Sequence, residues 1–191
     1  MFDLLPRGPR WIMVGRLDLT TSGVLLFTDD GELAHRLMHP SREVERVYAV
    51  RVLGDVTAVQ LQAMQRGVDV DGEQLRFDRI TPRGGSGVNQ WYECALHTGR
   101  NREVRRLWES QGLVVSRLIR IAYGPVGLPR NVPAGRWFDV TGQTLVALYA
   151  VAGLPAPAAE PGSRAATERA RRDGSRATRP RPAPRKPRSP N

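Results

Sequence analysis

Apolar and polar residues alternate along several short stretches of the chain, in the pattern of β-strands. Residues 46–52 alternate with apolar side chains on both sides, as expected for a buried strand. Residues 11–14, 24–27, 90–97 and 114–121 are further apolar runs of strand length. Asp71-Gly72, between two more such runs, is typical of a tight hairpin turn. The segments 15–23 and 84–87 have the composition of loops, and the second is predicted to be a flexible connection.

Helical spacing of apolar residues occurs in four other segments. Asp29 or Asp30 can cap a helix that carries Leu33, Leu37 and Met38 on one face and ends near His39. Further helices are expected over 57–66, 103–111 and 143–152. Strands outnumber helices, and neither a regular βαβ alternation nor a repeat is present. The pattern therefore predicts an α+β fold, with a mixed, mainly antiparallel sheet and flanking helices.

Charge divides the chain into two parts. The 191 residues carry a net charge of +10, of which residues 155–191 contribute ten basic and three acidic residues. This segment is rich in proline, arginine and alanine, has no aromatic residue, and contains too little apolar surface to form a core. We expect a folded domain over 1–154 and a disordered basic tail over 155–191.

The cysteine content, the length of the apolar runs and the first residues indicate the cellular compartment. Cys94 is the single cysteine, which rules out an intramolecular disulfide and a four-cysteine zinc site. Apolar runs are far shorter than the ~20 residues of a membrane span, and residues 1–6 do not resemble a signal peptide. The expected protein is cytoplasmic and does not contact a membrane.

Positive charge in the folded part is concentrated between residues 100 and 120. This window holds six arginines and two glutamates, while the rest of 1–154 is almost neutral. On the predicted helix, Arg102, Arg105 and Arg106 follow i, i+3, i+4 spacing opposite the apolar stripe. Such a concentration is typical of a surface that contacts phosphates, although a solvated helix face would have the same spacing.

Asp18 is the most conspicuous acidic residue, because it lies between Leu17 and Leu19 in a loop and two residues from Arg16. Aspartate often caps a turn through its carboxylate, which is one interpretation. The other is a carboxylate that is partly withdrawn from water and kept ionised by an arginine. The spacing alone does not decide between them.

Other chemistries receive little support. His35 and His39 have i, i+4 spacing, but further metal ligands are not evident, so no metal site is predicted. The serines lack a nucleophile-elbow setting, and no glycine-rich loop ends in Lys-Ser or Lys-Thr. Serine-hydrolase and nucleotide-driven reactions are therefore not expected.

Several motifs, taken together in order and spacing, resemble the RsuA/RluB family of bacterial ribosomal RNA pseudouridine synthases. They are Gly15-Arg16-Leu17-Asp18 and the residues to 33, 37–41, 45–50, Asn89-Gln90-Trp91-Tyr92, Gly99-Arg100-Asn101-Arg102 and the residues to 108, and 115–121. The resemblance covers roughly residues 2–145. It implies that 1–154 is a catalytic domain with the pseudouridine synthase fold and a central active-site cleft.

The resemblance also implies roles for single residues. Asp18 matches the catalytic aspartate, Tyr48 the tyrosine that packs on the target base, and Arg105 the basic residue that pairs with the aspartate. Leu118 or Ile119 would line the uracil pocket. The remaining residues expected to bind substrate are Arg16, Arg100, Arg102, Arg106, Arg117 and Arg120.

The implied reaction turns a specific uridine of large-subunit (23S) ribosomal RNA into pseudouridine. Since the base is detached from the ribose and rejoined through carbon, the reaction requires no cofactor. Asp18 would act as a nucleophile, or as a base in a glycal route. The uridine must be extruded from stacked RNA, with Tyr48 stacking on it. Ribosomal RNA, free or in a precursor particle, is the expected partner of a monomeric enzyme.

Two departures from the family pattern bear on these expectations. Family members begin with a small RNA-binding module and a first catalytic strand, so this chain resembles a form truncated at its N-terminus. Ala122 also stands where a further basic residue is expected. The alternative to the enzyme is a noncatalytic RNA-binding or ribosome-assembly factor.

Overall fold

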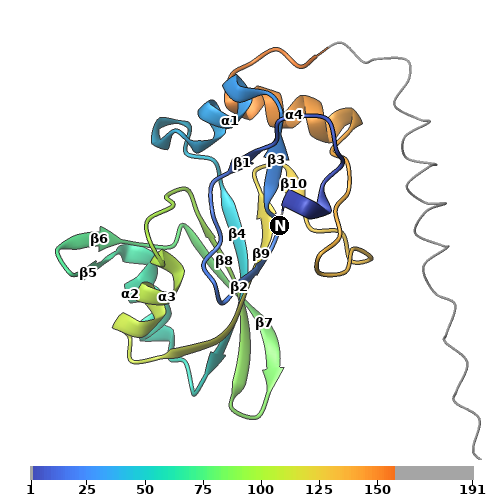
Figure 1. Ribbon diagram of the computed structural model, residues 1–191. Coiled ribbons are helices and arrows are strands. Elements are labelled where there is room, and N and C mark those ends of the chain that lie inside the picture. Colours follow the sequence, from blue (N-terminus) through green and yellow to red (C-terminus); the bar gives the residue numbers. More distant parts are fainter. Residues whose placement is uncertain (1, 158–191) are drawn as a thin grey trace, which may run out of the picture. The chain divides into compact units, whose positions relative to one another are not determined.

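Most of residues 2–157 form short strands and helices, drawn in Figure 1. The computed structural model describes residues 2–157, so most of the tail predicted for 155–191 lies outside the described residues. The strands are β1 (Ile12–Val14), β2 (Thr21–Gly23), β3 (Leu26–Thr28), β4 (Arg46–Leu53), β5 (Val68–Val70), β6 (Glu73–Leu75), β7 (Arg79–Ser86), β8 (Asn89–Leu96), β9 (Val114–Tyr123) and β10 (Val126–Gly127). The helices are α1 (Gly31–Met38), α2 (Ala58–Arg66), α3 (Glu103–Ser110) and α4 (Gly142–Ala152), with short 3-10 helices at Phe2–Leu4 and Pro40–Arg42.

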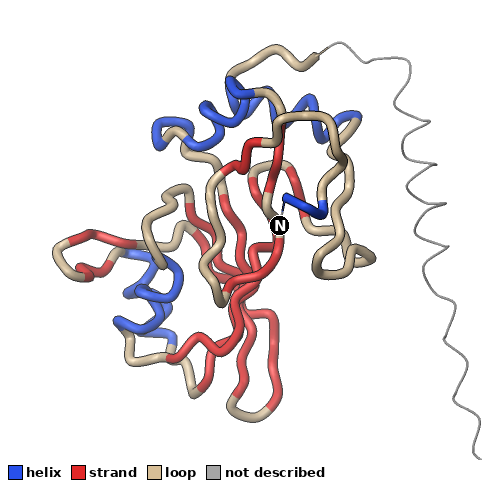
Figure 2. The backbone as a smooth tube through the Cα atoms, viewed as in Figure 1, coloured by secondary structure: helices blue, strands red, loops and turns tan. Residues whose placement is uncertain are grey.

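A six-stranded mixed sheet is the centre of the fold. Its order is β10-β9-β4-β8-β7, and β2 joins it by pairing in parallel with β9. The other pairings in this sheet are antiparallel. Strands are drawn in red in Figure 2. β1 and β3 form a separate antiparallel pair, as do β5 and β6. The α+β prediction with a mainly antiparallel sheet is confirmed.

Three details of the strand prediction were wrong. β2 lies inside the segment 15–23 that was predicted to be a loop, and β10 was not predicted. Residues 84–86, predicted as part of a flexible connection, belong to β7 and pair with β8. In each case hydrogen bonds to a neighbouring strand, rather than local composition, determine the conformation.

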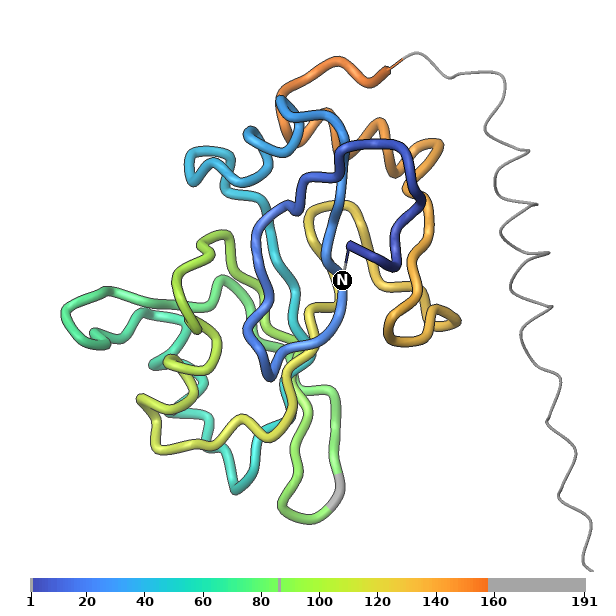
Figure 3. The backbone as a smooth tube through the Cα atoms, viewed as in Figure 1, coloured from blue at the N-terminus to red at the C-terminus, as the bar shows by residue number. Residues whose placement is uncertain are grey.

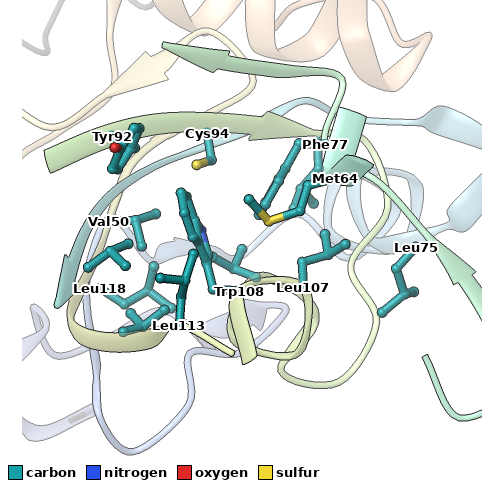
Figure 4. Packing of buried hydrophobic residues seen from close by; sticks show 14 residues of the cluster. Val50, Met64, Leu75, Phe77, Tyr92, Cys94, Leu107, Trp108, Leu113 and Leu118 are labelled. Atoms are coloured by element: carbon teal, nitrogen blue, oxygen red, sulfur yellow. The ribbon is translucent and has the colours of Figure 1, made fainter. Parts of the chain in front are cut away.

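Two hydrophobic clusters stabilise the two ends of the sheet. In the first, Trp108 of α3 packs among Phe77, Tyr92 and Leu107, all of them buried (Figure 4). Cys94 belongs to this cluster, and its burial raises the pKa of the thiol. None of the helices in residues 2–157 is both long enough and apolar enough to cross a membrane.

The second cluster lies against α1 and α4. It includes Leu33 and Leu37 of α1, Leu148 of α4 and Tyr123 of β9. Asp30 is the N-cap of α1, as predicted: its carboxylate accepts a hydrogen bond of 3.0 Å from the Leu33 amide. The hydroxyl of Tyr149 donates to the other carboxylate oxygen, which ties α4 to the start of α1.

β2 brings an early segment of the chain against a late one. In Figure 3 the blue segment that contains β2 runs beside the yellow β9 strand, and the register pairs Thr21 with Leu118 and Gly23 with Arg120. Gly23 has a φ of +114°, and a Cβ atom there would lie 2.6 Å from the Arg120 backbone nitrogen. Only glycine fits this close approach.

Replacing Gly23 by alanine should therefore separate β2 from β9. We expect Gly23→Ala to lower the free energy of unfolding by about 2–4 kcal/mol, because both the clash and the positive φ oppose a side chain. Gly127→Ala is the matched control: its Cβ would meet no atom within 4 Å, and its φ is not positive. Urea denaturation of both variants measures the difference, and equal stability of the two would contradict the close approach.

Candidate active site

Side chains from both ends of the sheet line a pocket of about 400 Å³. Its wall is made of the loop between β1 and β2, the strands β4 and β9, and the loop between β8 and α3. Seven of the predicted site residues line it: Arg16, Asp18, Tyr48, Arg100, Arg102, Leu118 and Arg120. Arg105, Arg106, Arg117 and Ile119 do not.

The Asp18 carboxylate is free of partners within residues 2–157. It is half-buried, and no hydrogen bond or ion pair to it is formed by the described residues. The turn is closed by backbone atoms, with the Thr21 amide donating to the Asp18 carbonyl oxygen at 2.9 Å. Asp18 is therefore not the side-chain cap of this turn. Leu17 faces the pocket and Leu19 is fully exposed.

Two buried arginines hold the loop that carries Asp18. Arg105 donates to the carbonyl oxygen of Thr20 at 3.0 Å and to that of Val115 at 2.9 Å. Arg120 donates from Nε to the carbonyl oxygen of Val24 at 2.8 Å and from Nη1 to that of Arg16 at 3.3 Å. Both side chains are nearly inaccessible, with 7% and 2% exposed.

The direct ion pair expected between Arg105 and Asp18 is not formed in this structure. Arg105 instead binds the carbonyl oxygen of Thr20, two residues after Asp18, and that of Val115 near the start of β9. It therefore fixes where Asp18 lies, which is a positioning role. The described residues give Asp18 no cation within 4.0 Å.

Arg102, Arg105 and Arg106, which were predicted to share one helix face, have different surroundings in the structure. Arg102 precedes α3 as its N-cap, with a left-handed φ of 48°, and its side chain lines the pocket. Arg105 is buried, whereas Arg106 points to the β5–β6 hairpin and binds Glu73 and the Val70 carbonyl oxygen. Of these three arginines only Arg102 is presented to the pocket, because the guanidinium groups of Arg105 and Arg106 join elements of the fold.

Strand alternation separates Leu118 from its neighbours. Leu118 is buried and lines the pocket, so Arg117 and Ile119 lie on the other face of the sheet. Leu118 or Ile119 was expected to line a pocket for the base, and of the two only Leu118 lines the pocket seen in the structure. Arg117 is exposed away from the pocket.

Other residues that line the pocket were not predicted from the sequence, among them Arg46, Glu103 and Tyr123. Arg46 donates to the carbonyl oxygens of His97 at 2.9 Å and Thr98 at 3.2 Å, and lies 5.1 Å from the ring centroid of Tyr123. Glu103 is buried and accepts hydrogen bonds from the Thr98 hydroxyl and the Arg100 amide. Arg46 could have been identified from its spacing, since it lies two residues before Tyr48 and so on the same face of β4.

The pocket is strongly basic. Five arginines line it (Arg16, Arg46, Arg100, Arg102 and Arg120), against the two carboxylates of Asp18 and Glu103. Within residues 2–157, no group of three or more His, Cys, Asp or Glu side chains is arranged to hold a metal ion. The arrangement is suited to an anionic substrate with an aromatic or heterocyclic part, for which Tyr48 and Leu118 provide apolar contacts.

Several proteins with a similar sequence are named pseudouridine synthases. The family described as RNA pseudouridylate synthase matches residues 3–110. Ribosomal large subunit pseudouridine synthase B of Haemophilus influenzae is 56% identical over 158 residues, which are 82% of this chain and 44% of that protein. The protein of the same name from Escherichia coli K12 is 58% identical over 142 residues, 73% of this chain and 49% of that protein.

A solved structure shares the fold. The crystal structure of a pseudouridylate synthase superposes with a TM-score of 0.67 at 25% identity, covering 77% of this chain and 64% of that one. The chain spans about half the length of the curated relatives that it matches.

The positioning role of Arg105 can be tested without any assay of activity. Arg105→Met removes the donors to the Thr20 and Val115 carbonyl oxygens, and we expect a loss of about 1–3 kcal/mol in the free energy of unfolding. Amide hydrogen exchange in residues 16–23 should become faster. The exposed Arg117→Met is the control. Unchanged exchange in Arg105→Met would show that the loop is held by other contacts.

Proposed function

Because the chain belongs to the RNA pseudouridylate synthase family, we propose that it converts a specific uridine of large-subunit (23S) ribosomal RNA to pseudouridine, with Asp18 as the catalytic carboxylate. The observation that carries the proposal is the state of Asp18: a half-buried carboxylate that has no partner among residues 2–157, in a pocket lined by five arginines. A carboxylate in that place repels phosphates, so it weakens simple RNA binding. Its place in the pocket therefore supports a role in the reaction.

The pocket can accommodate the two parts of a nucleotide in different ways. Tyr48 and Leu118 offer an aromatic and an aliphatic surface to an extruded base, and their strands are neighbours in the sheet. The surrounding arginines compensate the loss of phosphate hydration when the nucleotide leaves the RNA stack. This division supports a flipped uridine as the substrate.

The chemical step breaks the bond between C1′ of the ribose and N1 of uracil, and forms a bond from C1′ to C5. The proton on C5 is lost and N1 gains one, so the overall composition of the nucleotide is unchanged. Asp18 would add to C1′ as a nucleophile, or remove the proton from C2′ in a glycal route. Both routes require an ionised Asp18. Tyr48 would hold the detached uracil as it turns.

Several arginines would position Asp18 or bind the RNA around it. Arg105 and Arg120 fix the loop on which Asp18 lies, through the carbonyl oxygens of Thr20, Val24 and Arg16. Arg100 and Arg102 are presented to the pocket by the next loop and would contact phosphates. Arg106 and Arg117 lie outside the pocket, so any contact they make with RNA would be with flanking nucleotides.

We further propose that the protein acts in the cytoplasm as a monomer, on ribosomal RNA or a precursor particle. Mapping pseudouridine in ribosomal RNA from cells with and without the gene tests the proposal. Loss of one site in 23S RNA is expected; an unchanged map would favour a noncatalytic RNA-binding or assembly factor.

Asp18→Asn should retain the shape of the side chain and remove its charge. We expect pseudouridine formation to fall below detection, while RNA affinity stays the same or rises because a repulsive charge is lost. Asp55→Asn is the control, since Asp55 is exposed and lies outside the pocket. The assay is pseudouridine detection in a 23S RNA transcript after incubation with each variant. Turnover by Asp18→Asn would refute the assigned role.

A further inference from the structure

Two buried polar groups of the pocket have no hydrogen-bond partner among the described residues. They are Nη2 of Arg120 and the hydroxyl oxygen of Thr21. Both residues line the pocket, and the Arg120 side chain is 98% buried, with an exposed fraction of only 2%. Buried donors without partners are rare in folded proteins, because their hydration is lost and not replaced.

Arg120 is in addition a buried cation without a counter-ion. Its Nε and Nη1 donate to backbone carbonyl oxygens, and its guanidinium lies 5.2 Å from the ring centroid of Tyr123. These contacts are with neutral groups, and none of the ion pairs in residues 2–157 includes Arg120. A buried charge is stabilised much better by an opposite charge than by neutral acceptors. The missing partner of Arg120 is therefore an anion.

The sheet places both groups beside the residues assigned to the base. Thr21 pairs with Leu118 in the β2–β9 register, and Arg120 pairs with Tyr48 in the β4–β9 register. An anion bound by Thr21 and Arg120 would thus lie next to a base held by Tyr48 and Leu118. In a nucleotide the group that meets this requirement is a phosphate attached to the same ribose.

We propose that Arg120 Nη2 and the Thr21 hydroxyl bind a phosphate oxygen flanking the extruded uridine. This inference rests on the proposed function and assigns to Thr21 a role in holding the substrate. The bound phosphate would complete the hydrogen bonds of both groups and neutralise Arg120. Since Arg120 also holds the Asp18 loop, the same arginine would link the phosphate to the position of the reacting carboxylate.

The experiment compares uridine with uridine 5′-monophosphate and uridine 3′-monophosphate, each titrated calorimetrically into the wild-type chain. At least one monophosphate should bind about tenfold more tightly than uridine, the effect expected of hydrogen bonds to a charged group. The phosphate position with the higher affinity identifies which side of the nucleotide is held. Equal affinity for all three ligands would overturn the proposal.

Variants assign the effect to this pair of residues. Thr21→Val keeps the shape of the side chain without the hydroxyl, and should reduce the preference for the monophosphate about threefold to tenfold with uridine affinity unchanged. Thr21→Ser keeps the hydroxyl and is expected to keep the preference. Arg120→Gln should abolish it, provided that urea denaturation confirms a folded protein. A preference that survives in Thr21→Val and in folded Arg120→Gln would refute the proposal.

The outcome is independent of turnover. A phosphate preference that depends on Thr21 and Arg120, together with an unchanged pseudouridine map in cells, would support the phosphate site and reject the proposed function. Pseudouridine formation without any phosphate preference would support the proposed function and reject the phosphate site.

Discussion

The position of the Asp18 loop depends on two arginines buried on either side of it. The loop follows β1, and at its C-terminal end the chain pairs in parallel with β9 over the three residues of β2. Arg105 and Arg120 add hydrogen bonds from a helix and a strand that lie about a hundred residues later in the sequence. Because each guanidinium has several donors in a fixed plane, it can hold two carbonyl oxygens at once. Of the two arginines, Arg120 also lines the pocket.

Most of the scaffold could be predicted from local patterns, and the exceptions have a common cause. The helices α1 to α4 and the long strands β4, β8 and β9 were recognised because caps, glycine stops and alternation are properties of contiguous residues, whereas β7 was not predicted. β2 and β10 have three and two residues, and exist because β9 offers them hydrogen bonds. Register shifts at Val47/Tyr48 and Arg51/Val52 also change which residues of β9 share a face, so Tyr123 could not be assigned to the pocket by counting.

The site shows the same division between local motif and tertiary contact. The motifs identified Asp18, Tyr48 and Leu118, each of which lines the pocket. The arginines were harder to assign, since helical spacing treats Arg102, Arg105 and Arg106 as equivalent. Their surroundings differ: one faces the pocket, one is buried against the Asp18 loop, and one binds an acidic hairpin. Glu103 was overlooked because its partners, the Thr98 hydroxyl and the Arg100 amide, lie in the preceding loop.

That preceding loop, residues 97–102, is held from both sides. Arg46 binds its carbonyl oxygens, while Glu103 binds the Thr98 hydroxyl and the Arg100 amide. The loop therefore has little conformational freedom left to lose when Arg100 and Arg102 meet a ligand. Association of flexible loops loses affinity through ordering, and a loop ordered during folding avoids that loss. The conformational entropy of this loop is therefore lost during folding, and little more is lost when Arg100 and Arg102 bind a polyanion.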